Sequence, residues 1–252
     1  MLIDHLSHSN RWARVNPAEK GLFALGGLGA ALLCRSPGPA LMLTALMAAL
    51  TVFAAGIPVR AYLRLLLLPA GFLLAGTLGL ALTLADGGDA LVRFGPWALS
   101  SSGLAQAALV FSRSLAAVSS LYLLALTTPM TGILTLLRRC RVPMLLIELA
   151  VLAYRQLFVF FEVARQMRLA QASRLGYAGY RNSLRSLGLL GAHLFARAHQ
   201  RSRLLHRSLL ARGYDGELRW LEQEWPLSRG RLLLAGSGAI VLVFLALTGG
   251  AG

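Results

Sequence analysis

The fold class follows from stretches such as residues 62–85, YLRLLLLPAGFLLAGTLGLALTLA. After Arg64 this stretch carries no charge until Asp86. A helix that crosses a bilayer needs about 20 mainly apolar residues, so residues 62–85 predict a transmembrane helix. The whole chain agrees with this interpretation: only 14% of its 252 residues are charged, against about 25% in a typical soluble domain.

Four further segments are apolar enough to be membrane spans. They are Gly21–Leu33, Pro39–Ile57, Leu104–Thr127 and Leu232–Thr248. The first is short, with Lys20 and Arg35 close to its ends. It could cross the bilayer fully, or it could form a re-entrant hairpin with the second segment. We expect a retained helix rather than a signal peptide, because no small-x-small cleavage site follows the apolar run.

Basic charge is concentrated in one region of a chain whose net charge is +15. Residues 129–229 hold sixteen arginines and six acidic residues. Because cytoplasmic loops carry the excess of Lys and Arg, we expect this region and the N-terminus in the cytoplasm, and the C-terminus outside. The predicted fold is all-α and polytopic, with about five spans. Its domains are residues 1–128 (membrane), 129–229 (cytoplasmic, helical) and 230–252 (membrane).

The basic region is predicted to form two long helices. The first runs from about Met144 to Leu175 and is stopped by Gly176, and the second runs from about Ser183 to Arg212. At 1.5 Å per residue, each is roughly 45 Å long. Leucines and arginines alternate with helical spacing in the second, which predicts a long amphipathic helix that serves an interface or a partner.

Both helices end in the same short motif. The first ends in Ser173-Arg174-Leu175, before Gly176 and Tyr177, and the second in Ala211-Arg212-Gly213, before Tyr214. Each motif alone is explained by capping, because Arg suits the negative end of the helix dipole and Gly suits the left-handed cap. Recurrence after 38 residues favours a second interpretation, in which two arginines dock into two equivalent sites on a partner.

The chain lacks the residues that would let it transport or catalyse alone. Its only lysine, Lys20, precedes Gly21, whereas a P-loop needs Lys followed by Ser or Thr. The expected spans contain no Asp, Glu or His, which autonomous carriers place there. Cys34 and Cys140 lie far apart and suggest no metal site. We therefore expect no enzyme, no cofactor and no bound metal, with substrate binding and energy supplied by other subunits.

Arg113 is the charged residue that lies well inside an expected span. One interpretation makes it a polar anchor for a partner helix or a cluster of carbonyl groups. The other gives it a structural role, either snorkelling or facing the protein interior. We favour the structural role, because arginines within membrane segments often serve folding.

At the two arginine motifs the sequence resembles the T component of energy-coupling factor transporters, in the cobalt branch of the CbiQ type. That family carries Ala-Arg-Gly or Ala-Arg-Ser at the ends of two cytoplasmic coupling helices. Ala211-Arg212-Gly213 matches directly, and Ser173-Arg174-Leu175 departs from the triplet on either side of Arg174. Other parts of the chain are similar to the family as well: Asn16-Pro17-Ala18-Glu19-Lys20, Gly56-Ile57-Pro58, Thr127-Thr128-Pro129 and Tyr154-Arg155.

The resemblance implies a complex in a bacterial cytoplasmic membrane. Two CbiO-type ATPase subunits would dock on Arg174 and Arg212. A CbiM-type membrane subunit, with or without a CbiN-type helper, would hold the metal ion. The chain would contact the lipid bilayer and no nucleic acid, and would transmit the closure of the ATPase dimer to the substrate subunit.

Three alternatives stay open at this point. The same coupling role could serve nickel or a vitamin, because the substrate lies in another chain. The protein could be a stand-alone carrier or channel, which the missing intramembrane ligands disfavour. The basic helices could also bind anionic lipid or nucleic acid, in which case Arg→Lys changes would be tolerated everywhere.

Overall fold

The computed structural model describes residues 2–13, 15–84, 90–94, 97–214, 225 and 228–248. The chain forms two compact units, Met1–Leu136 with Gln223–Gly252, and Leu137–Glu222. The helices of the first unit are α1 (Leu2–Ser9), α2 (Pro17–Leu33), α3 (Pro37–Ala49) with its π-helical continuation η1 (Leu50–Ala54), α4 (Val59–Ala81), α5 (Ser101–Thr127) and α9 (Arg229–Thr248). The short helix α6 (Met130–Arg139) runs across the boundary between the units, and the second unit holds α7 (Met144–Ser173) and α8 (Tyr180–Leu210).

The protein is a polytopic, helical membrane protein. Five of the described helices are long and apolar enough to cross a bilayer: Pro37–Ala54, Val59–Ala81, Gly103–Thr127, Met144–Ser173 and Gly230–Thr248. The number agrees with the sequence prediction, but the membership differs. Helix α2 has 17 residues and falls short in length, whereas α7 meets the criteria although we expected it in the cytoplasm.

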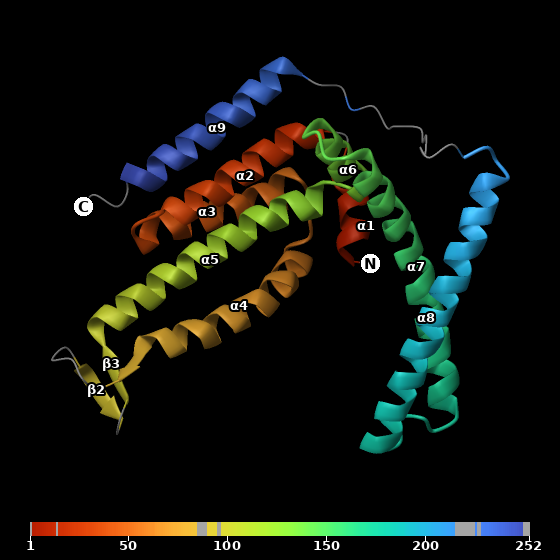
Figure 1. The fold of residues 1–252 in the computed structure, drawn as a ribbon. Helices are drawn as coiled ribbons and strands as arrows, with labels where there is room; N and C mark the ends of the chain where they lie inside the picture. Colours follow the sequence, from red (N-terminus) through yellow and green to blue (C-terminus); the bar gives the residue numbers. More distant parts are fainter. Residues whose placement is uncertain are drawn as a thin grey trace. The chain divides into compact units, whose positions relative to one another are not determined.

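In the first unit, helix α2 packs against both α9 and α5 (Figure 1). Small residues allow the close approach of α2 and α9. A Cβ atom added to Gly26 would lie 2.3 Å from the Cβ of Ala239 and 3.1 Å from its Cα. Such small-residue contacts are typical of helix pairs in membranes, where close van der Waals packing replaces the hydrophobic effect as the attraction between helices.

Helix α4 contains Pro69, and α5 compensates for the hydrogen bond that this proline removes. Proline has no N–H, so the carbonyl of Leu65, four residues earlier, loses its helical partner. The hydroxyl of Tyr122 on α5 donates to this carbonyl oxygen over 3.0 Å. The ring of Tyr122 also meets that of Tyr62 edge to face, with ring centroids 6.5 Å apart. These contacts join α4 to α5.

A small antiparallel sheet between α4 and α5 was not predicted from the sequence. It consists of β1 (Leu82–Leu84), β2 (Ala90–Phe94) and β3 (Trp97–Ser100), in the order β1-β3-β2. The expected span Tyr62–Ala85 is therefore helical only to Ala81, because residues 82–84 pair with residues 97–99 instead. Ala85 lies outside the described residues.

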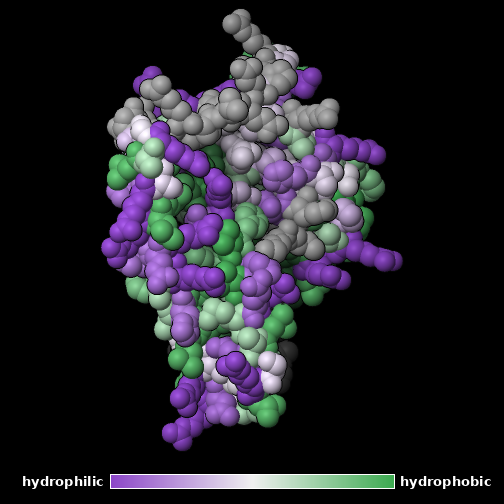
Figure 2. Space-filling view, turned by 90° about the vertical axis from the view of Figure 1, so that its right-hand side faces the viewer, coloured by the Kyte–Doolittle hydropathy of each residue, from purple (hydrophilic) through white to green (hydrophobic). Residues whose placement is uncertain are grey.

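The second unit contains two long helices, as the sequence predicted, and they run antiparallel to each other (Figure 1). Helix α8 begins at Tyr180, three residues before its expected start. The Nε of Arg201 donates to the Oε1 of Gln156 over 2.7 Å and connects the two helices. On the face seen in Figure 2, hydrophilic and hydrophobic side chains are interspersed.

The contact between α2 and α9 generates a matched pair of substitutions. Gly26→Ala places a methyl group against Ala239 and should lower the free energy of unfolding by about 1–3 kcal/mol, the usual cost of overpacking. Gly29→Ala on the same helix meets nothing within 4 Å and should leave stability unchanged or raised. Thermal unfolding in detergent measures both, and equal effects of the two changes would contradict the close contact.

Candidate docking sites at two helix ends

The end of α7 forms a Schellman cap, in which a residue in left-handed conformation turns the chain out of the helix. Leu175 takes that conformation with φ 57°. Its N–H donates to the carbonyl of Ala172 over 3.0 Å, and the N–H of Gly176 donates to the carbonyl of Gln171 over 2.8 Å. Arg174, exposed to solvent, is the last residue before the left-handed position.

The end of α8 repeats this cap. Gly213 is left-handed with φ 78°. Its N–H donates to the carbonyl of Leu210 and the N–H of Tyr214 donates to the carbonyl of Leu209, each over 3.0 Å. Arg212 is exposed and again directly precedes the left-handed residue.

The two arginines therefore occupy equivalent positions in equivalent caps. Aligned by hydrogen bonds, Arg174 corresponds to Arg212, and Leu175 corresponds to Gly213. One of the two departures of the first motif from the family triplet, Leu175, thus lies at the left-handed position, which glycine usually occupies. The side chain of Leu175 is 73% exposed, so it stands next to Arg174 as an apolar group.

A third cap shows that this geometry does not need arginine. At the end of α6, Arg141 is left-handed with φ 59°. Its N–H donates to the carbonyl of Arg138, and the N–H of Val142 donates to that of Leu137. The position of Arg174 and Arg212 is filled there by Cys140. Capping alone therefore does not explain why both long helices place arginine at this point.

The first arginine lies on a turn held by side-chain hydrogen bonds that the sequence analysis missed. The Nε2 of Gln171 donates to the carbonyl of Ser186, whose hydroxyl donates to the carbonyl of Gly176 over 2.7 Å. The hydroxyl of Tyr177 donates to the Oε1 of Gln171 over 2.8 Å. A Cβ at Gly176 would lie 2.8 Å from the Gln171 carbonyl oxygen, so this turn requires glycine there.

Arg113 contacts a helix end rather than the middle of a neighbouring helix. Its Nε donates to the carbonyl oxygen of Cys34, the residue that caps the C-terminus of α2. A cation at this position also interacts favourably with the negative end of the helix dipole. This contact places Arg113 level with the end of α2, and the structural role of Arg113 stays a prediction.

A cluster of polar side chains lies at the opposite end of α2. Lys20, which precedes the apolar run of that helix, is only 3% exposed. Its Nζ donates to the carbonyls of Trp12 and Thr127 over 3.0 and 2.7 Å. Burial lowers the pKa of Lys20 to about 8, against the opposing effect of the Glu19 carboxylate. The sequence showed Lys20 as a flanking charge and did not reveal these partners.

The same cluster reaches the segment that leads into α9. The side-chain amide of Asn16 donates to the carbonyl of Trp225 over 3.1 Å. The backbone N–H of Ser228 donates to the Oε1 of Glu19 over 3.4 Å. Residues around the start of α2 thus bind the last turn of α5 and the segment before α9.

No metal site is evident among the described residues. In the part of the chain that the structure describes, no three His, Cys, Asp or Glu side chains are grouped so that they could hold an ion. His8 instead lies 3.7 Å from the Asp4 carboxylate on the same helix. Cys34 is buried and Cys140 exposed, both as free thiols.

These features define a multi-pass membrane protein whose second unit presents two matching arginine caps. The chain belongs to the CbiQ family, because the model of that family, described as cobalt transport protein, matches residues 9–222. The cobalt transport protein CbiQ of Rhodobacter capsulatus is 38% identical over 87% of this chain and 86% of that protein. The CbiQ of Salmonella typhimurium is 30% identical over 85% of this chain and 97% of its own length. A putative fused cobalt transport protein CbiMQ of Methanocorpusculum labreanum is 32% identical over 88% of this chain, which covers 38% of the fused protein.

The left-handed leucine generates a prediction about the first cap. The left-handed conformation costs roughly 1–2 kcal/mol for a residue with a Cβ atom. Leu175→Gly keeps this conformation and removes its cost. Hydrogen exchange at the capping amides of residues 175 and 176 should therefore be unchanged or slower. Leu169→Gly, a similarly exposed leucine inside α7, should instead loosen the helix by about 1 kcal/mol. Faster exchange in Leu175→Gly would show that the leucine side chain stabilises the turn.

Proposed function

We propose that the chain is the transmembrane coupling subunit of an ATP-driven energy-coupling factor importer for cobalt ions. The observation that carries the proposal is the equivalence of Arg174 and Arg212, two exposed arginines at the same position of two matching caps. A partner with two copies of one socket could engage both. Membership of the CbiQ family supports cobalt as the transported ion.

In this mechanism each arginine enters a groove on one CbiO-type ATPase subunit and pairs there with a carboxylate. Arginine suits this task, because its planar guanidinium forms two parallel hydrogen bonds with a carboxylate and so fixes direction as well as distance. Closure of the ATPase dimer on ATP then moves the ends of α7 and α8. The chain itself acts as a non-catalytic subunit.

The substrate is assigned to another membrane subunit, of the CbiM type, with or without a CbiN-type helper. The relative whose printed name is CbiMQ supports this partner, because that name joins the two components in one polypeptide. A stand-alone carrier is disfavoured by the apolar spans, and a nickel importer would need the same coupling subunit. No role for nucleic acid is proposed.

We place α7 and α8 in the cytoplasm together with the N-terminus, and the C-terminus outside. This arrangement needs an odd number of spans, so α2 must cross the bilayer with α3, α4, α5 and α9 although it has only 17 residues. Although α7 is long and apolar enough to cross a bilayer, its first 20 residues already include Glu148, Arg155 and Glu162. Charged groups within a span are costly and rare. A crossing by α7 would also place Arg174 and the arginines of α8 on the opposite side from Arg138, Arg139 and Arg141, against the distribution that determines orientation.

The paired arginines should be necessary for assembly. Truncating one side of a buried charge pair costs about 2–5 kcal/mol, so Arg174→Ala or Arg212→Ala should weaken co-purification of the ATPase and cobalt uptake. The double variant should abolish both. Arg→Lys at either position should also fail substantially, since lysine lacks the planar fork.

Matched controls separate docking from general charge. Arg197→Ala and Arg203→Ala remove the same charge from exposed positions on α8 and should have much smaller effects. If capping were the main role, the loss would be only about 0.3–1 kcal/mol and lysine would replace arginine well. A double variant that still holds the ATPases and still imports cobalt would refute the coupling role.

The proposed orientation is testable with the exposed native thiol of Cys140. A membrane-impermeant maleimide should label Cys140 in inverted vesicles and not in intact spheroplasts. Gly38→Cys, exposed at the start of α3, should give the reverse pattern in a Cys140→Ser background. Labelling of Cys140 from outside would overturn the assignment of the basic region to the cytoplasm.

A further inference from the structure

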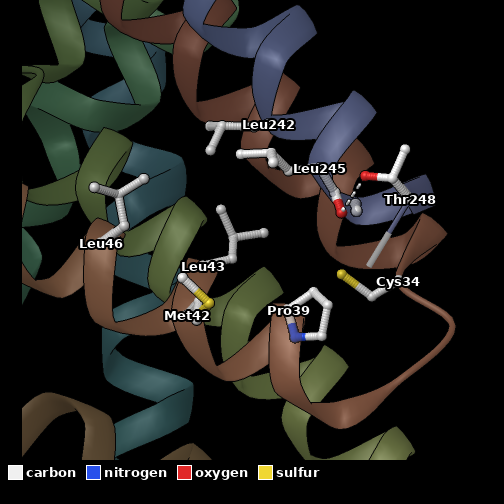
Figure 3. Close-up of a pocket in the computed structure, with 9 residues that line it drawn as sticks. Cys34, Pro39, Met42, Leu43, Leu46, Leu242, Leu245 and Thr248 are labelled. Atoms are coloured by element: carbon white, nitrogen blue, oxygen red, sulfur yellow. Dashed lines mark hydrogen bonds between the residues drawn. The ribbon is translucent and has the colours of Figure 1, made fainter. Parts of the chain in front are cut away.

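An apolar groove lies between the first half of α3 and the last two turns of α9, beside the end of α2 (Figure 3). Its volume is about 320 Å³, and Met42, Leu43, Leu242 and Leu245 are among the residues that line it. Thr248 also lines the groove, and its hydroxyl donates a hydrogen bond over 3.0 Å to the carbonyl of Phe244 in its own helix. The groove therefore suits an occupant with no hydrogen-bonding groups.

Cationic side chains lie at the end of this groove. Cys34 lines it, Arg35 follows directly in the chain and is exposed, and Arg113 donates to the Cys34 carbonyl. The sequence supplies no carboxylate to these arginines from the neighbouring helices, because no Asp or Glu occurs in residues 21–85, 97–147 or 225–252. Arg35 is exposed and the helices that flank the groove supply no carboxylate to it, so this end of the groove suits an anionic group.

The extent of the groove matches one leaflet. Its wall on α3 runs from Pro39 to Leu46, which is roughly 11 Å along the helix axis. The hydrocarbon core of one leaflet is about half of the 30 Å bilayer core. A transmembrane helix of a partner would instead need a stripe along the whole length of α3 and α9. The dimensions thus favour a single chain that enters from one side.

We propose that this groove is a phospholipid site, with one acyl chain between α3 and α9 and an anionic headgroup on Arg35. The phosphate takes charge-assisted hydrogen bonds from Arg35, and the guanidinium of Arg113 adds positive charge at the same end of α2. The site lies at the opposite end of α2 from Lys20. The lipid site shares no residue with the arginine caps, so a test of this site does not depend on the proposed coupling role.

Photolabelling with a lipid probe tests the site. The full chain is placed in nanodiscs that contain a small fraction of phosphatidylglycerol with a diazirine on its acyl chain, and labelled residues are mapped by mass spectrometry. Labelling at Met42 and Leu245 should exceed labelling at Leu68 and Phe72 of α4 at least threefold. Those α4 side chains are the more exposed, at 82% and 80%. Equal or lower labelling of the groove would therefore show that it contacts bulk lipid only and would overturn the proposal.

Variants test the two halves of the site. Leu245→Trp fills the groove and should reduce its labelling at least fivefold, whereas Leu68→Trp on α4 should not. Arg35→Ala should remove the preference for phosphatidylglycerol over a phosphatidylcholine probe, and Arg35→Lys should keep it, because a phosphate accepts from either cation. If Arg35→Ala keeps the preference for phosphatidylglycerol, as Arg35→Lys does, the headgroup contact is refuted.

A partner helix is the competing occupant. The same labelling is repeated on the complex assembled with its metal-binding membrane subunit and ATPases. Labelling at Met42 and Leu245 should persist in the complex. If assembly abolishes it, the groove belongs to a protein interface and the lipid assignment is wrong.

Discussion

The first unit depends on the buried ammonium group of Lys20. This group binds the carbonyl oxygens of Trp12 and Thr127, which belong to the N-terminal segment and to the last residue of α5. The neighbouring Asn16 and Glu19 bind the segment before α9. The chain leaves the bundle toward α6 just after Thr127 and returns just before α9, so one short polar segment fixes both points.

Hydrogen bonds give Arg174 and Arg212 the same backbone setting, but their surroundings differ. The first arginine stands beside an exposed leucine, on a turn held by Gln171 and Ser186. The second is followed by glycine. In the proposed docking, two ATPase subunits of identical structure would therefore meet similar charges but unequal apolar surfaces.

Sequence patterns predicted the elements that depend on composition and missed those that depend on contacts between distant residues. Long uncharged runs predicted the spans, and the recurrence of Arg174 and Arg212 predicted equivalent helix ends. The left-handed position of Leu175 was hidden, because a leucine gives no local signal for it. Thr127, which Lys20 binds, and Cys34, which Arg113 binds, lie 107 and 79 residues away in the chain, beyond any local pattern. The sheet at residues 82–100 was missed because Leu82–Leu84 continues the apolar run of α4.

The contacts at its two ends show that α2 covers only part of α5. Lys20 meets Thr127 and Cys34 meets Arg113, so the first twelve residues of α5 extend past α2 by roughly 18 Å. Helices α2 and α9, with 17 and 20 residues, are about 26 and 30 Å long, whereas α5 with 27 residues is about 40 Å long. The hydrophobic thickness of the first unit is thus unequal around its perimeter. Hydrophobic mismatch of this kind is accommodated by helix tilt or by a local change in bilayer thickness. The membrane beside α9 should therefore be thinner than the membrane beside α4 and α5.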